Sequence, residues 1–548
     1  MSIKVPDSPE ELISDGKYKE WRHFQKQAVE EIIQTNGVLG QVQPTGSGKS
    51  LTYISAALLT GLKTVILTST KALQNQIMRD FGSQVKLIMG QNNYPCNLDD
   101  TVNCDEGVCH LGVPCNFREK GCAYYDALET ARSADVVVTN YHYWMHAKDT
   151  LRPSFLIMDE AHHVPEILMD FMTIEFNMQE VNKLFNCEIP YHGEDVDEWV
   201  ITGKQFLGMS RMMLDTVKNA LISNPYDKKW REIGRKTRIA EKLFTNISNM
   251  AGQWIVERDR QDVKMFPVSP SKYSCETYLT RGVNKVFLTS ATLSQKTMDM
   301  LYISPYTFTE YPSVFPLKNR RLFHVKTCQV NHKTKTETLV SQWLQRIDKI
   351  IDIFGKDKKG IIHTGSYARQ KLIVEHSRHK DIFFHNTRYT TQLVVERFKK
   401  AKGQAVLVSP SVTAGFDFPY EQCSYQIIGK LPFPDTRGRV WEERRKQNPF
   451  ISNYLTAQAL TQMCGRGVRA ADDSCINFII DDSIIWWWST AGLVLCPEWF
   501  RESVVLCANI PELFVCGLDD RRILTPMQIF NMRKEEEKRK RNEMKQGN

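Results

Sequence analysis

The chain has 548 residues, of which 42% are hydrophobic and 24% are charged, and its formal net charge is +8. A single hydrophobic core does not grow to this size, so we expect two to four domains. The composition excludes a globally disordered chain, and the small positive charge permits a polyanionic partner without requiring one. No stretch approaches the roughly 20 apolar residues of a membrane span, and residues 1–12 lack the apolar run of a signal peptide. We therefore expect a cytoplasmic protein that does not contact a membrane.

Short apolar or β-branched runs alternate with amphipathic stretches between residues 38 and 158. The expected strands are residues 38–42, 64–68, 85–89, 136–139 and 155–158, and the expected helices are residues 51–59 and 72–81. Alternation of this kind predicts a parallel sheet covered by helices. Uniformly apolar runs such as VVVT and FLIM are typical of strands that are buried on both faces.

The sequence QPTGSGKS at residues 43–50 lies between the first expected strand and the first expected helix, which is the context of a phosphate-binding loop. Its glycines let backbone N–H groups approach phosphate oxygens, its lysine brings a positive charge to the β and γ phosphates, and its last serine offers a hydroxyl to Mg²⁺. The residues expected to bind ATP here are Thr45, Gly46, Ser47, Gly48, Lys49 and Ser50. Gln43 stands where the usual pattern has its first glycine. A glycine-rich turn without a ligand is the alternative, which the strand–loop–helix context disfavours.

Five of the 14 cysteines lie between Cys96 and Cys122, in a polar stretch without clear periodicity. In a cytosolic chain such a cluster indicates metal ligation rather than disulfides. The stretch is too polar to form its own core, so a bound metal is expected to supply its folding energy. Four thiolates bind either a [4Fe–4S] cluster or one Zn²⁺, and the spacing alone does not choose between them. Buried thiols without a metal are the remaining alternative.

Residues 159–162 read DEAH and directly follow the expected strand 155–158. A carboxylate at the C-terminal end of such a strand can face the nucleotide crevice. We expect Asp159 to hold Mg²⁺ together with Ser50, and Glu160 to orient and polarise the attacking water. His162 either links the nucleotide state to a second lobe or packs in the core.

The second half of the chain divides into a helical stretch and a second region of alternating strands and helices. Residues 165–278 look mainly helical, with the best patterns at residues 178–184, 206–221 and 236–250. The strands expected afterwards are residues 286–289, 360–364, 382–385, 405–409, 425–429 and 476–480. This return of the pattern predicts a second sheet-and-helix domain, which a charged tail follows from about Met532.

The sequence QMCGRGVR at residues 462–469 contains Gln462, Arg466 and Arg469. The two arginines are three residues apart, so on a helix they share a face. A guanidinium contributed by a second lobe can stabilise the charge on the γ-phosphate in the transition state. Gln462 lies one turn earlier and would contact the nucleotide or the water, which makes hydrolysis depend on lobe closure. A solvated basic helix face is the alternative, although Cys464 and two glycines are unusual on such a face.

Together these sequences resemble the motifs of superfamily-two helicases. QPTGSGKS and DEAH resemble motifs I and II, and the others follow in order: TSTKALQNQ (Ia, 68–76), TSATL (III, 289–293), GIIHTGSY (IV, 360–367), TAGFDFP (V, 413–419) and QMCGRGVR (VI, 462–469). The cysteine stretch lies between motifs Ia and II and ends in Cys122-Ala-Tyr-Tyr, which is similar to the XPD/DinG family of iron–sulfur helicases, and the compact length resembles a bacterial or phage DinG-type protein. Ala414 departs from the acidic residue that the family usually has in motif V, whereas Asp417 keeps its later position.

The resemblance implies an α/β fold with two RecA-like motor domains, an inserted iron–sulfur cluster domain and a helical Arch domain. The expected boundaries are residues 1–89, 126–164 and 279–305 for motor domain 1, 90–125 for the cluster domain, 165–278 for the Arch, 306–531 for motor domain 2 and 532–548 for the tail. The implied [4Fe–4S] ligands are Cys96, Cys109, Cys115 and Cys122, with Cys104 as the spare. The pair Cys104 and Cys109 competes for the two middle positions. Gln27, which precedes motif I, is expected either to contact adenine or to be an exposed helical glutamine.

The resemblance also implies an ATP-dependent DNA helicase, a monomer that moves 5′ to 3′ along single-stranded DNA and separates duplexes in repair, replication or recombination. Forked DNA and RNA–DNA hybrids are the expected substrates, and the cytosol of a bacterium or of a phage-infected host is the expected location. Two alternatives stay open: a translocase that does not separate strands, and a nucleic-acid-binding module whose cluster senses redox state. Ser69, Thr70 and motifs IV and V are expected to contact the nucleic-acid backbone. Tyr141, Tyr143 and Trp144 are either stacking platforms for bases or core residues.

Overall fold

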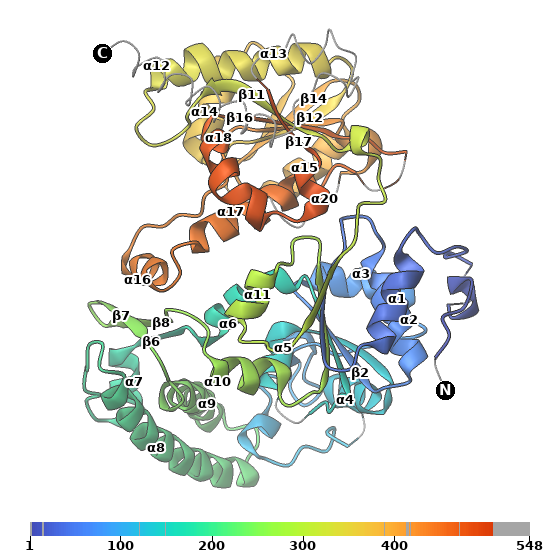
Figure 1. Ribbon diagram of the computed structural model, residues 1–548. Helices are drawn as coiled ribbons and strands as arrows, with labels where there is room; N and C mark the ends of the chain where they lie inside the picture. Colours follow the sequence, from blue (N-terminus) through green and yellow to red (C-terminus); the bar gives the residue numbers. More distant parts are fainter. Residues whose placement is uncertain are drawn as a thin grey trace, which may run out of the picture.

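The computed structural model describes residues 3–507, except for residues 14, 15, 120, 148, 149, 388, 389, 413–415, 417, 469 and 471. Two lobes lie one above the other in Figure 1, and each is built on a seven-stranded sheet. A three-stranded sheet lies beside the lower, first lobe. The predicted α/β class with two RecA-like sheets is therefore confirmed. Arg469 and most of the predicted motif V, including Ala414 and Asp417, lie outside the described residues.

The sheet of the first lobe is parallel throughout, in the order β10-β1-β9-β5-β2-β4-β3. Its strands are β1 (Val38–Val42), β2 (Thr64–Thr68), β3 (Lys86–Leu87), β4 (Val136–Asn140), β5 (Phe155–Asp159), β9 (Lys285–Ser290) and β10 (Thr307–Glu310). The central strands β2 and β5 are buried along their whole length, because helices cover both faces of the sheet as the apolar runs predict. The strand predicted at residues 85–89 is present but shorter.

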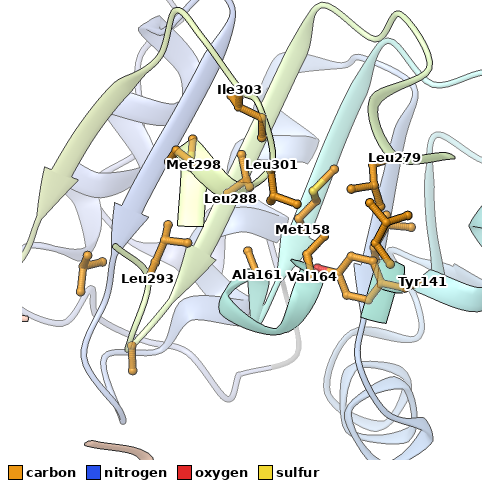
Figure 2. Close-up of a cluster of buried hydrophobic side chains, with 14 of the residues drawn as sticks. Tyr141, Met158, Ala161, Val164, Leu279, Leu288, Leu293, Met298, Leu301 and Ile303 are labelled. Atoms are coloured by element: carbon orange, nitrogen blue, oxygen red, sulfur yellow. The ribbon is translucent and has the colours of Figure 1, made fainter. Parts of the chain in front are cut away.

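The first lobe has eight α-helices among its described residues. They are α1 (Gln25–Gln34), α2 (Lys49–Thr60), α3 (Lys71–Phe81), α4 (Ala123–Ser133), α5 (Tyr141–His146), α6 (Val164–Met172), α10 (Lys272–Ser274) and α11 (Gln295–Met300). Of these, α2, α3 and α5 follow the carboxyl ends of β1, β2 and β4. Two helices begin at capping side chains: Thr70 accepts a hydrogen bond from the backbone of α3, and Asn140 from the backbone of α5. On one face of the sheet, Met158, Leu288 and Tyr141 gather in a core that anchors these loops (Figure 2).

The second lobe repeats the arrangement with the strand order β13-β14-β12-β15-β16-β11-β17, again wholly parallel. Its strands are β11 (Leu322–Cys328), β12 (Lys359–His363), β13 (Ile382–Phe384), β14 (Ala405–Ser409), β15 (Tyr425–Ile428), β16 (Ile476–Asp481) and β17 (Val504–Cys507). Its helices are α12 (Thr336–Thr338), α13 (Gln345–Phe354), α14 (Tyr367–His376), α15 (Thr391–Lys400), α16 (Arg439–Gln447), α17 (Ile451–Cys464), α18 (Ser483–Trp487), α19 (Leu493–Leu495) and α20 (Glu498–Arg501). Five of these strands match the predicted runs, whereas β11 and β17 were not predicted.

Two segments leave the first lobe. The cysteine segment, residues 90–122, lies between β3 and α4, and its described residues form only short turns such as η3 (Val108–Leu111). The inserted segment, residues 173–271, follows α6 and contains β6 (Ile174–Asn177), α7 (Met178–Phe185), α8 (Val196–Ser223), α9 (Lys228–Ser248), β7 (Trp254–Asp259) and β8 (Asp262–Pro267). Its helices overlap the three predicted ones, but the antiparallel sheet β6-β8-β7 was not predicted. Trp199 and Phe244 lie in a hydrophobic core that belongs to this segment.

The first lobe ends later than the boundary predicted at residue 305. Strand β10 pairs with β1 at the edge of the first sheet, so that sheet extends to Glu310. The chain then crosses to the second lobe, where β11 begins at Leu322 (Figure 1). In the described part of the chain, none of the helices combines the length and the apolarity that crossing a bilayer requires.

Candidate nucleotide site between the lobes

The predicted phosphate-binding loop connects β1 to α2. Gly46 and Gly48 have φ values of 75° and 85°, a conformation that glycine adopts without steric cost. Gln25, at the start of α1, fixes this loop: its Nε2 donates to the Gly48 carbonyl at 3.0 Å, and its Oε1 accepts from the Arg22 backbone N–H at 3.0 Å. A guanidinium nitrogen of Arg22 donates to the Gly46 carbonyl. The loop is therefore held from outside through the carbonyls of Gly46 and Gly48, and from inside by the Ser47 N–H, which donates to the Pro44 carbonyl at 3.2 Å.

The glutamine that contacts this loop is not the predicted one. Gln27 is exposed on α1, whereas Gln25 is buried against the loop. The side chains of a helix two residues apart point in different directions, so only one of the two can face the nucleotide site. The contact with the base, predicted for Gln27, therefore passes to Gln25 as a proposal.

The acidic residues that follow β5 face the loop. Lys49 Nζ lies 3.8 Å from Glu160 Oε1. The Tyr53 hydroxyl donates to Asp159 Oδ2 at 3.2 Å and lies 3.3 Å from Ser50 Oγ. Tyr53 thus brings together the two oxygen groups that were predicted to hold Mg²⁺, and nothing in the sequence pattern had singled it out.

The two neighbouring carboxylates differ in their electrostatics. Burial and the adjacent charge of Glu160 raise the pKa of Asp159 to about 7. Burial also opposes ionisation of Glu160, but Lys49, the two neighbouring histidines and the hydrogen bond from Ser290 together outweigh it and lower the pKa of Glu160 to about 2. A divalent cation beside Asp159 would favour its ionised form, so the pair fits a site in which one carboxylate holds the metal and the other stays ionised to accept hydrogen bonds from water.

His162 lies in a chain of hydrogen bonds that begins in the second lobe. Gln462 Nε2 lies 3.3 Å from His162 Nε2, His162 Nδ1 lies 2.6 Å from Ser290 Oγ, and the Ser290 hydroxyl donates to Glu160 Oε2 at 3.1 Å. Burial holds the pKa of His162 well below its ordinary value. A neutral ring with its proton on Nδ1 accepts from Gln462 and donates to Ser290, so His162 occupies the linking position rather than a purely packed one. We call Gln462–His162–Ser290–Glu160 the relay.

Gln462 also donates to Thr292 Oγ1 at 3.4 Å, and Gln458, one turn before it, donates to the His162 carbonyl at 3.4 Å. The predicted contact of Gln462 with nucleotide or water is thus replaced, in this arrangement, by contacts with the first lobe. Gln458 and Thr292 were not predicted as site residues; Thr292 lies within the TSATL sequence at residues 289–293, and Gln458 lies one helical turn before Gln462.

The second lobe touches the phosphate-binding loop itself. A Cβ placed on Gly465 would lie 2.8 Å from Thr45 Cγ2, and a Cβ placed on Gly46 would lie 2.3 Å from the Phe315 ring. Phe315 belongs to the crossing between the lobes and packs in a core of the second lobe. Next to Gly465, Arg466 is buried and donates to the Phe416 carbonyl at 2.7 Å. The predicted arginine segment therefore lies beside the predicted phosphate loop, although the two are more than 400 residues apart in the sequence.

The predicted nucleic-acid contacts are less well supported. Tyr141, Tyr143 and Trp144 are buried; the Tyr141 hydroxyl donates to the Asp159 carbonyl at 2.8 Å, and the Trp144 N–H donates to the Leu279 carbonyl at 2.7 Å. Of the two roles expected for them, stacking platform or core residue, their burial agrees with the second. Thr70 is exposed at the start of α3, and Ser69 is half-buried beside it, so both stay candidates.

The cysteine segment brings its thiols together around one glycine. Cys104 Sγ lies 3.8 Å from Cys122 Sγ, and a Cβ placed on Gly107 would lie 3.5 Å from the Sγ atoms of both Cys96 and Cys109. Cys104, the predicted spare, also donates through its thiol to the Pro95 carbonyl at 3.2 Å. Among the described residues, no three His, Cys, Asp or Glu side chains are arranged as a finished metal site. The side chains are of the type that binds a metal or a cluster through thiolates, and they lie close together, but their positions do not define a coordination geometry.

Two parallel RecA-like sheets with a phosphate-binding loop at their contact define a two-lobed protein of the P-loop class. A DEAD/DEAH box helicase model matches residues 22–174, and a helicase C-terminal domain model matches residues 351–495. Each model covers somewhat more than a quarter of the chain, one in each lobe, and together with the relatives below these matches support an XPD/DinG-like helicase.

Known proteins resemble parts of the sequence and most of the fold. The ATP-dependent DNA helicase YoaA of Haemophilus influenzae is 27% identical over 26% of this chain and 32% of its own length. The 3′-5′ exonuclease DinG of Staphylococcus epidermidis is 24% identical over 25% of this chain and 22% of its own length. The match thus spans about a third of these relatives or less. The match to a solved XPD helicase structure covers 88% of this chain and 98% of that structure, with a TM-score of 0.57 and 13% sequence identity. The match to the structure of S. tokodaii Xpd4 covers 89% of this chain and 100% of that structure, with a TM-score of 0.55 and 14% sequence identity. At these identities the likeness concerns the fold.

Proposed function

We propose that this chain is an ATP-dependent DNA helicase that moves along single-stranded DNA and separates duplexes during repair, replication or recombination. The observation that carries the proposal is the contact of both lobes with one phosphate-binding loop: Thr45 meets Gly465, and the relay joins Gln462 to Glu160. A nucleotide bound there is sensed by both lobes, so its hydrolysis changes how they pack. The relatives named as DNA helicases support DNA as the polymer.

Each group at the site has a role in hydrolysis that its position supports. Lys49 neutralises phosphate charge, and Ser50 and Asp159, joined through Tyr53, hold the magnesium ion that polarises the phosphate oxygens. Glu160 orients the attacking water, with its own position fixed by Lys49 and Ser290. Arg466 contributes charge from the second lobe once the Phe416 carbonyl releases it.

The cysteine segment is proposed to bind a [4Fe–4S] cluster. The thiols of Cys96, Cys109 and Cys122 converge around Gly107 and Cys104, and a metal supplies folding energy to a segment that lacks a large core. We assign Cys115 as the fourth ligand and Cys104 as the spare, because the Cys104 thiol already donates its proton to the Pro95 carbonyl. A bound cluster would chiefly hold the segment rigid.

The two readings of the fourth ligand are separated by single substitutions. We expect Cys109→Ser and Cys115→Ser to abolish visible absorbance and bound iron, and Cys104→Ser to retain both. Iron and zinc are measured together on protein purified without oxygen. A colourless Cys104→Ser variant beside a fully coloured Cys115→Ser variant would exchange the two assignments, and stoichiometric zinc in place of iron would overturn the cluster.

The inserted segment packs on the cysteine segment, which supports our proposal that it acts as the Arch. Arg231 of α9 pairs with Asp99 at 2.6 Å, and Leu111 and Val113 share a small core with Val217. Both segments leave the first lobe, and they also contact each other directly through this ion pair and this core. A strand that passes between them would be held apart from its complement, which is the action that strand separation requires.

Unwinding of forked duplexes tests the proposal. We expect ATP-dependent separation of substrates with a 5′ single-stranded arm, no separation with a 3′ arm, and an ATPase rate raised by single-stranded DNA more than by RNA. Stimulation of the ATPase without strand separation would replace the helicase by a translocase. An ATPase rate indifferent to every nucleic acid would overturn the proposal, and loss of DNA binding on reduction or oxidation alone would favour a redox-sensing binding module.

A further inference from the structure

A cavity of about 260 Å³ lies where the two lobes and the inserted segment meet. Its walls come from α6 and α11 of the first lobe, from the loop after β8, and from α16 and α17 of the second lobe. One end reaches His162 of the relay, and the rest takes no part in the hydrolysis described above. We call this cavity the interlobe pocket.

Three polar side chains in the walls of the interlobe pocket have no hydrogen-bond partner among the described residues. They are the carboxylate of Glu166, the indole N–H of Trp441 and the ammonium group of Lys296. All three are half-buried. Their polar atoms are not sealed from solvent, so water satisfies them in the empty pocket, and a ligand that offers both donors and acceptors can take the place of that water.

Trp441 is held at the pocket by its neighbour on α16. The Arg444 guanidinium lies 5.6 Å from the centre of the Trp441 ring, and it donates to the carbonyls of Pro267 at 3.3 Å and Val268 at 3.2 Å. These bonds join α16 of the second lobe to the end of β8 in the inserted segment. The indole is therefore part of a fixed wall rather than a free surface side chain.

The chemistry of these walls matches an unpaired nucleobase. The flat face of a base can stack on the Trp441 ring. An exocyclic amine of the base can donate to the Glu166 carboxylate, and an acceptor of the base can accept from the indole N–H. Lys296 suits the phosphate that accompanies the base, whereas Glu166 and Asp299 disfavour a phosphate inside the pocket. Pockets for drug-sized ligands begin at about 300 Å³, so a cavity of about 260 Å³ suits a group no larger than one base with part of its sugar.

We propose that the interlobe pocket holds one unpaired base of the bound strand and that its occupancy favours closure of the two lobes. The inference rests on the proposed function, because it requires a single strand as ligand. Lys296 and Glu166 come from the first-lobe helices and Trp441 from the second lobe, so a base between them bridges the lobes. A ligand that binds only the closed arrangement shifts the population towards it, and closure is the state in which the relay and Arg466 reach the nucleotide site.

The test compares strands with and without bases on the full-length protein. The ATPase rate is titrated with a deoxycytidine oligonucleotide, a thymidine oligonucleotide and an abasic oligonucleotide of equal length, and binding is followed by fluorescence anisotropy. We expect the abasic strand to bind through its phosphates but to stimulate hydrolysis weakly. Trp441→Ala should raise the concentration of the deoxycytidine strand needed for half-maximal stimulation by about tenfold or more, the effect of one lost base–aromatic stack.

Matched variants keep the outcome interpretable. Trp441→Phe keeps an aromatic face and should retain most of the stimulation. We expect the deoxycytidine strand to stimulate more than the thymidine strand, because thymine has no exocyclic amine for Glu166. Glu166→Gln should reduce this difference, because its amide offers one acceptor to the cytosine amine and also a donor to a thymine carbonyl. Tyr226→Ala and Glu175→Gln alter exposed side chains of the inserted segment outside the pocket and should match the unaltered protein. Equal stimulation by abasic and intact strands, with no effect of Trp441→Ala, overturns the inference and leaves the proposed function standing. Absence of stimulation by any strand overturns both.

Discussion

Glu160 holds its carboxylate in place with a backbone conformation that few residues other than glycine adopt. Its φ is 50°, and such a conformation costs on the order of 1–3 kcal/mol. The cost is offset by contacts that fix the side chain, namely Lys49 at 3.8 Å and the Ser290 hydroxyl at 3.1 Å. The strained backbone therefore belongs to the residue that we propose orients the attacking water, and this role requires a carboxylate in a fixed position.

His363, at the end of β12, gives the second lobe a dependence on pH. Its Nε2 donates to Gln426 Oε1 at 2.9 Å, and its buried Nδ1 has no partner among the described residues. Burial, with a smaller contribution from Arg466, lowers the pKa of His363 from an ordinary 6.5 to about 4. Between these values the unfolded chain binds a proton that the folded chain does not. Stability from this residue is thus complete above pH 6.5 and falls as the pH drops towards 4, by up to ~3 kcal/mol.

Thermal unfolding at neutral pH and near pH 5 measures this effect. We expect the unfolding midpoint of the His363→Gln variant to fall less on acidification than that of the unaltered protein, because glutamine keeps a donor for Gln426 and binds no proton. His376→Gln is the control, because His376 is exposed at the end of α14. Its unfolding midpoint should fall on acidification as much as that of the unaltered protein. Equal acid sensitivity of all three proteins would contradict the assignment.

At the scale of elements, the sequence predicts the parts whose pattern is local. The runs at residues 64–68 and 155–158 are apolar throughout because both faces of β2 and β5 are covered, and that pattern is visible without neighbours. Strand β10 is different: its first and last residues, Thr307 and Glu310, are exposed and the two between them are half-buried, and it becomes a strand because β1 offers it an edge. The strands β6, β7 and β8 were missed for a related reason, since each short run is stabilised by pairing rather than by its own composition.

The same distinction applies to the site. The residues of QPTGSGKS and DEAH could be assigned from sequence, because a strand–loop–helix context determines where they point. Tyr53, Gln25 and Phe315 could not, since their roles depend on side chains that approach from other elements. Gln25 and Gln27 illustrate this limit, because both lie in the segment before motif I and the sequence does not show which of them faces the loop. The rotation of α1 about its axis decides this.

The contact between α9 and the cysteine segment carries a further prediction. A Cβ placed on Gly234 would lie 2.5 Å from Leu111 Cδ1 and 2.8 Å from Val217 Cγ1. Gly234→Ala should therefore push the cysteine segment away, even though alanine favours a helix over glycine by about 1 kcal/mol. We expect faster proteolytic cleavage within residues 90–122 and a lower unfolding midpoint.

Gly208→Ala is the matched control, because Gly208 lies in α8 and a Cβ there would meet nothing within 4 Å. It gains the same helix propensity without a clash, so it should equal or exceed the stability of the unaltered protein. If Gly208→Ala and Gly234→Ala resist protease alike, the direct packing of the inserted segment on the cysteine segment is refuted.

At the scale of the whole molecule, the two lobes share one cluster of buried hydrophobic residues, which includes Leu288 of the first lobe and Leu460 and Met463 of the second, and specific polar contacts add to it. The Trp499 N–H donates to the Ala291 carbonyl at 2.9 Å, and Tyr454 and Thr297 share a hydrogen bond of 2.6 Å. The inserted segment adds a third support, because Arg444 of α16 binds the carbonyls that end β8. Each lobe also has a core of its own, so the proposed function requires the shared contacts to part and re-form while these separate cores stay intact.

The most direct test of the central claim is the turnover of Arg466→Ala with single-stranded DNA present, measured together with its affinity for ATP. If a group from the second lobe completes the site, the hydrolysis rate should fall by roughly 10³-fold or more while ATP affinity changes little, because the loop, Lys49 and Asp159 stay intact. Arg445→Ala, an exposed arginine of α16, should hydrolyse ATP at the unaltered rate. Hydrolysis by Arg466→Ala at the rate of the unaltered protein would contradict the account.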